Sequence, residues 1–83
     1  MRVSVDISLY PLTEHYADPI LAFIDKLEKN PKLNISRNNL STQIFGEYRD
    51  VMDAMDSEIE AVFNQLPHSV FVLKMIGTDR YQV

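Results

Sequence analysis

The chain of 83 residues is long enough for one domain and too short for two hydrophobic cores. It has no cysteine, which excludes disulfides, thiolate metal sites and cysteine nucleophiles. Its net charge of −4 disfavours binding to nucleic-acid phosphates. No apolar run is long enough to span a bilayer and no secretory signal is visible, so we expect a cytoplasmic protein with no membrane partner.

The first ten residues alternate between apolar and polar side chains, which predicts a strand with one buried face. The aliphatic residues of this strand would face the core. The opposite face would carry Ser4, Asp6, Ser8 and Tyr10. A strand that opens a small domain needs only its apolar face for packing, so the polar face is a candidate for function.

Five further elements follow in the sequence. Apolar periodicity, together with proline, asparagine and glycine near the boundaries, predicts a helix, a hairpin of two strands, a second helix and a last strand. Their approximate ranges are 18–29, 33–36, 40–47, 49–66 and 69–76.

The predicted order βαββαβ is typical of a ferredoxin-like α+β sandwich. In this fold a four-stranded antiparallel sheet carries both helices on one face and leaves the other face open. We expect a single domain over residues 1–83, with a core of about 1–76 and a short polar tail, 77–83.

The open face is predicted to combine polar and apolar residues. In the strand 40–47, Thr42 and Ile44 would point inward, while Ser41, Gln43, Phe45 and Glu47 would point outward. The last strand is apolar on both faces, and the orientation that keeps Lys74 out of the core exposes Val70, Val72 and Ile76. An apolar patch of this size favours cover by a second copy of the domain. Polar groups inside such an enclosure are typical of a small-molecule site.

Three segments of the chain, residues 5–12, 40–48 and 70–74, resemble the thiamine-binding YkoF-like family. The resemblance extends over about residues 1–76. It implies a ferredoxin-like fold and a homo-oligomer, either a dimer or a tetramer. It also implies a non-enzymatic protein without a cofactor, which binds thiamine or its hydroxymethylpyrimidine moiety in vitamin salvage or transport.

The same resemblance implies a ligand site near the sheet and the subunit boundary. The residues carried over from the matched segments are Ser8, Tyr10, Ser41, Thr42, Glu47, Asp6 and Lys74. Thiamine has a cationic thiazolium ring, with which Asp6 or Glu47 could pair. Its aminopyrimidine edge could bond to hydroxyls and amides, and its rings could stack on Tyr10 or Phe45.

Other interpretations of these residues stay open. Asp6 and Glu47 could pair with Lys74 or Arg2 across the sheet or across a dimer, and Tyr10 could serve only to seal an interface. The chain could be a structural or regulatory module whose open sheet docks a protein partner without a small-molecule ligand. A small enzyme is a third possibility, but neither His15 nor His68 has a readable nucleophile or carboxylate partner.

Overall fold

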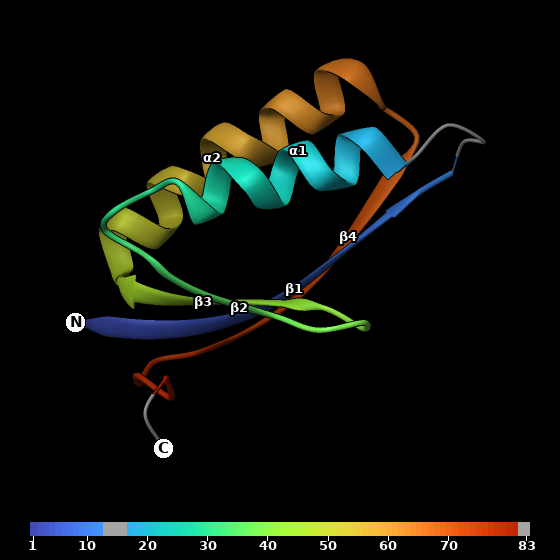
Figure 1. The fold of residues 1–83 in the computed structure, drawn as a ribbon. Coiled ribbons are helices and arrows are strands. Elements are labelled where there is room, and N and C mark those ends of the chain that lie inside the picture. The colour runs from blue at the N-terminus through green and yellow to red at the C-terminus, as the bar shows by residue number, and fades with distance from the viewer. Residues whose placement is uncertain (13–16, 82–83) are drawn as a thin grey trace.

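The computed structural model describes residues 1–12 and 17–81. The elements follow the predicted order (Figure 1). They are β1 (Arg2–Pro11), α1 (Ala17–Glu28), β2 (Asn34–Arg37), β3 (Thr42–Glu47), α2 (Tyr48–Gln65) and β4 (Ser69–Ile76). No helix in the described ranges has the length and apolar character needed to cross a membrane.

The four strands form one antiparallel sheet in the order β2-β3-β1-β4, and both helices lie on the same side of it (Figure 1). The central strand β1 pairs with β3, with Ile7 opposite Thr42, and with β4, with Asp6 opposite Lys74. This arrangement confirms the predicted ferredoxin-like α+β fold.

The core lies between the sheet and the two helices. Val3, Val5 and Ile7 of β1 are almost fully buried there, as their alternation predicts. The apolar stripes of the helices cover them, because residues three and four apart share one helix face. Phe23 and Leu27 come from α1, and Val51, Met55 and Val62 from α2.

The turn between β2 and β3 shortens the predicted strand 40–47. The Asn38 side-chain oxygen accepts hydrogen bonds from the backbone N–H groups of Leu40 (2.8 Å) and Ser41 (3.0 Å). A side chain that binds the backbone in this way holds residues 38–41 in a turn, so the strand begins at Thr42. The other boundaries agree with the predicted ones to within one residue, and those of β4 coincide with them.

The structure describes only one of the two histidines. His15 lies outside the described residues. The backbone carbonyl of His68 accepts a hydrogen bond from the N–H of Leu12 (3.0 Å), so this residue joins the end of β1 to the start of β4.

Residues 77–81, here called the C-terminal latch, cross one end of the open face. The Ser4 hydroxyl donates to the carbonyl of Thr78 (2.7 Å) and accepts from the N–H of Arg80 (2.8 Å). The Tyr81 ring packs on Phe45, with centroids 5.1 Å apart. The prediction that Phe45 is exposed on the open face is therefore wrong, because the latch leaves it only 8% exposed.

The rest of the open face keeps its apolar strip. Val70, Val72 and Ile76 of β4 are each between 44% and 53% exposed. This outcome confirms the predicted orientation of β4, since Lys74 lies on the same face opposite Asp6.

Candidate functional site

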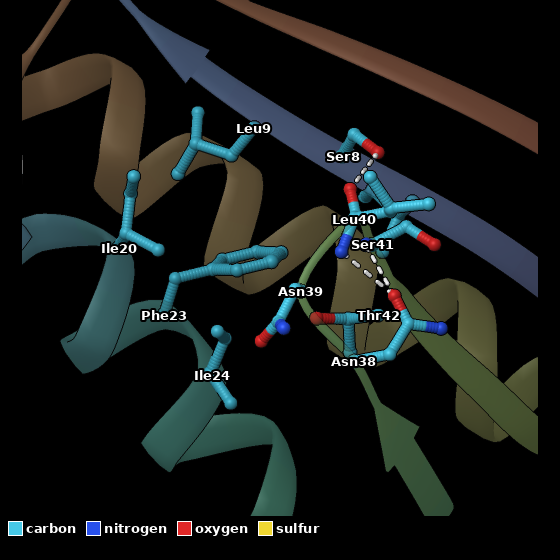
Figure 2. Close-up of a pocket in the computed structure, with 11 residues that line it drawn as sticks. Ser8, Leu9, Ile20, Phe23, Ile24, Asn38, Asn39, Leu40, Ser41 and Thr42 are labelled. Atoms are coloured by element: carbon cyan, nitrogen blue, oxygen red, sulfur yellow. Dashed lines mark hydrogen bonds between the residues drawn. The ribbon is translucent and has the colours of Figure 1, made fainter.

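A cavity of 160 Å³ lies between α1, the end of β1 and the β2–β3 turn (Figure 2). We call it the hairpin cavity. Three of the seven predicted site residues line it: Ser8, Ser41 and Thr42. They come from two segments that are far apart in the sequence and adjacent in the sheet.

Thr42 is the most deeply placed of the three, with 6% of its surface exposed. It lies directly opposite Ile7 on β1, and residues paired in this way share one face of the sheet. Thr42 therefore points toward the helices. Within the described part of the chain its hydroxyl has no hydrogen-bond partner, so it is available to a ligand.

Two asparagines of the turn add amide groups to the cavity wall. The oxygen of Asn38 is occupied by the turn, which leaves its NH₂ group to donate elsewhere. The side chain of Asn39 lies between the turn and the Phe23 ring (Figure 2). Ser8 donates a long hydrogen bond of 3.5 Å to the carbonyl of Leu40, which ties the turn to β1.

The opposite wall of the hairpin cavity is apolar. Phe23, Ile20 and Ile24 of α1 face the turn, and Leu9 of β1 adds to them (Figure 2). No charged side chain lines the cavity in the described residues. An aromatic wall opposite neutral donors and acceptors suits a flat, uncharged heteroaromatic ring.

Asp6 and Lys74 lie on the other side of the sheet, in a polar cluster on the open face. The Gln43 side chain donates to the Asp6 carboxylate (3.1 Å) and to the Ser41 hydroxyl (2.8 Å). The Lys74 ammonium is 3.7 Å from the second Asp6 oxygen. Hydrogen bonding involving Ser41 and Gln43, together with the Lys74 charge, holds the pKa of Asp6 below its ordinary value.

The structure thus confirms the cross-sheet pairing of Asp6 with Lys74. These two residues line a shallow hollow of 380 Å³ beside the C-terminal latch, not the hairpin cavity.

The two remaining predicted residues line neither hollow. Glu47 accepts from the N-terminal ammonium of Met1 (3.0 Å) and lies 3.9 Å from the guanidinium of Arg2. Its predicted pairing with Arg2 is therefore present. Tyr10 lies on the open face at the opposite end of β1, beside Val70, and is 53% exposed.

The residues missed in the sequence are Phe23, Asn38 and Asn39. Phe23 belongs to the apolar stripe of its helix, so its spacing indicated core packing only. The two adjacent asparagines indicated a turn, which they form. Their proximity to α1 depends on how the hairpin folds over the helix, and local patterns carry no such information.

A four-stranded antiparallel sheet under two helices, with a small cavity of neutral lining, defines this chain as a ferredoxin-like domain. The family model described as the YkoF-related family matches residues 2–78. The chain belongs to this family. No curated protein sequence gives a significant match.

Several solved structures share the fold. A candidate thiamine biosynthesis/salvage protein from Thermotoga maritima is 19% identical, with a TM-score of 0.81, over 94% of this chain and 85% of that one. A hypothetical protein from Methanocaldococcus jannascii is 19% identical, with a TM-score of 0.79, over 98% of this chain and 84% of that one. A Streptococcus pneumoniae protein is 15% identical, with a TM-score of 0.76, over 100% and 93%. At these identities the likeness establishes the fold alone.

Proposed function

We propose that the protein binds thiamine or its hydroxymethylpyrimidine moiety without catalysis or a cofactor, in vitamin salvage or transport. Membership of the YkoF-related family and the description of the Thermotoga relative support a thiamine-related role. The observation that carries the proposal is that the strand segments of Ser8, Ser41 and Thr42 meet at the hairpin cavity, where Thr42 turns its side chain toward the helices and the Ser41 hydroxyl bonds to Gln43 on the open face. The resemblance implied these residues separately, from two distant segments.

The chemistry of the cavity suits the pyrimidine half of the vitamin. An aminopyrimidine is flat, and it presents an amino donor and ring-nitrogen acceptors along its edge. The Thr42 hydroxyl and the Asn39 amide would contact this edge, while Phe23 would contact the ring.

The volume of the cavity limits how much of the ligand it encloses. Pockets for drug-sized ligands have volumes of about 300–1,000 Å³. The hairpin cavity has 160 Å³, so it suits a single ring better than the whole two-ring vitamin. The thiazolium ring of thiamine would then extend outside. This position fits the lack of a carboxylate among the described lining residues.

Titration calorimetry with thiamine and with hydroxymethylpyrimidine tests the proposal. Because the charged ring lies outside, we expect the two compounds to bind with dissociation constants within about tenfold, or about 1.4 kcal/mol, of each other. Absence of binding to both compounds would contradict the proposal. It would favour the rival interpretation, in which the open sheet docks a protein partner.

We also propose that the chain forms a homo-oligomer through the open face. The exposed strip of Val70, Val72 and Ile76 supports this arrangement, because a second copy would remove these side chains from water. The chain has no disulfide, and self-association is a common source of stability for domains of this size.

A further inference from the structure

A groove of 510 Å³ runs between α2 and β4, separate from the hairpin cavity. Three of the four methionines of the chain line it: Met52, Met55 and Met75. Ile59, Phe63 and Leu73 add to the apolar surface, and the last two are each about two-fifths exposed. Met75 is 40% exposed and Met52 is partly buried, while Met55 belongs to the core. Methionine is flexible and polarisable, so the accessible methionine surface can adapt to varied apolar partners.

The groove borders a free edge of the sheet. β4 is the last strand in the order β2-β3-β1-β4, and β1 is its only strand neighbour in the described residues. Proline, bulges and charged residues usually protect such an edge. β4 has no proline, and its one charged residue, Lys74, lies beside Asp6 on the open face. The outer edge of β4 can therefore accept another strand.

Two acidic residues on α2, Asp56 and Glu60, line the groove. Neither forms an ion pair within the described residues. The other acids of α2 differ in this respect. Asp50, Asp53 and Glu58 lie within 4 Å of Lys32, Arg49 and Lys26 respectively. The uncompensated charge is thus located beside the apolar groove.

This charge argues against a second copy as the occupant. Symmetric pairing of two β4 strands would create an isologous interface, in which each α2 meets the same surface of the other. Asp56 and Glu60 would then approach their own counterparts, and like charges oppose such contact. A basic partner would neutralise them.

We infer that the β4 edge and the groove bind an extended peptide in which lysine or arginine alternates with aliphatic residues. The peptide adds a strand to β4. Its basic side chains lay their apolar stems along the methionines and reach Asp56 and Glu60 with their charged ends. Its aliphatic residues point to the other face and extend the strip of Val70 and Val72.

Fluorescence anisotropy with a labelled, end-blocked octapeptide of alternating lysine and valine tests this inference. We expect saturable binding that weakens as salt is added. A glutamate–valine peptide and a lysine–valine peptide with a central proline should each bind at least about tenfold more weakly, or about 1.4 kcal/mol. The first control removes the charge match, and the second prevents strand addition.

A pair of matched variants locates the site. Glu60→Gln should weaken binding of the lysine–valine peptide by about fivefold, or about 1 kcal/mol. Glu28→Gln makes the same charge change on α1, away from the groove, and should leave binding unaltered. Equal effects of the two variants, or equal binding of the acidic peptide, would overturn the inference.

Sedimentation distinguishes between two possible occupants of the groove, a peptide and a second copy of the chain. Leu73 and Val72 are neighbours on β4 that point to opposite faces of the sheet. If Leu73→Gln dissociates a wild-type dimer and Val72→Gln does not, the groove belongs to a second copy and the inference is wrong. The inference holds if Leu73→Gln keeps the wild-type mass and loses peptide binding.

Discussion

Asp6 occupies the middle of the open face, between Gln43 on β3 and Lys74 on β4. Its neighbours stabilise the carboxylate, so the pKa of Asp6 in the folded state lies below the ordinary 3.8. A carboxyl group whose pKa is lower in the folded state contributes its full stabilisation at pH values above its pKa in the unfolded state. The contribution is lost as the pH falls through the folded pKa.

The direction of this pKa shift leads to a prediction for a variant of Asp6. Asp6→Asn should lower the free energy of unfolding near neutral pH, because the variant lacks the carboxylate that Gln43 and Lys74 contact. Below pH 3.8 the difference from the wild type should shrink, since the wild-type carboxyl becomes protonated. Urea unfolding of both proteins at a series of pH values measures this difference in free energy. Two stability curves that stay parallel down to the lowest pH would contradict the prediction.

Thr42 shows how two sequence arguments fit together. Alternation predicts that Thr42 points inward, whereas the family resemblance implies that it contacts a ligand. Both hold only if the ligand lies on the helix side of the sheet, and the hairpin cavity is on that side. The strand pattern could predict the orientation of Thr42. It could not predict that a gap remains between the β2–β3 turn and α1.

The hydroxyl of Thr42 provides a prediction about binding. Thr42→Val keeps the shape of the side chain and removes the hydroxyl that would bond to the ligand. Affinity for hydroxymethylpyrimidine should therefore fall about tenfold, or about 1.4 kcal/mol. Calorimetry measures the affinity. Thr78→Val makes the same change in the exposed C-terminal latch and should bind as the wild type does. Equal affinities for the two variants would remove Thr42 from the site.

At the scale of elements, the C-terminal latch turns a polar tail into part of the fold. The Arg2 side chain bonds to Asp79, 77 positions away in the sequence, at 2.5 Å. This contact lowers the pKa of Asp79 and raises that of Arg2. Order and type of the six elements could be predicted because their periodicity is local. The latch could not, because its contacts join the two ends of the described chain.

The latch should contribute to stability through its aromatic contact. Tyr81→Ala removes the ring that packs on Phe45 and exposes an apolar surface on the sheet. We expect the free energy of unfolding to fall by about 1 kcal/mol. Chemical denaturation measures the change. Tyr10→Ala is the control, because the Tyr10 ring lies on the same face and has no aromatic partner in the described residues. An equal effect of both substitutions would mean that the latch adds little.

At the scale of the whole molecule, the hairpin cavity, the groove and the apolar strip are spatially separate. The hairpin cavity lies between α1 and the β2–β3 turn, the groove lies between α2 and β4, and the apolar strip lies on the far side of the sheet. A second copy on the open face would therefore leave the hairpin cavity accessible. Ligand binding and self-association can then be perturbed independently.

Val72 tests self-association through the open face. It lies opposite Ser8 in the middle of the apolar strip and is 53% exposed, so a substitution there should spare the core. Val72→Glu places a charge where the proposed interface excludes water, and burying an unpaired charge is costly. We expect the variant to sediment as a monomer while it still binds hydroxymethylpyrimidine. Leu21→Glu puts the same charge on an exposed apolar position of α1 and should keep the wild-type mass. If Val72→Glu also keeps that mass, the open face is not the surface through which the chain associates.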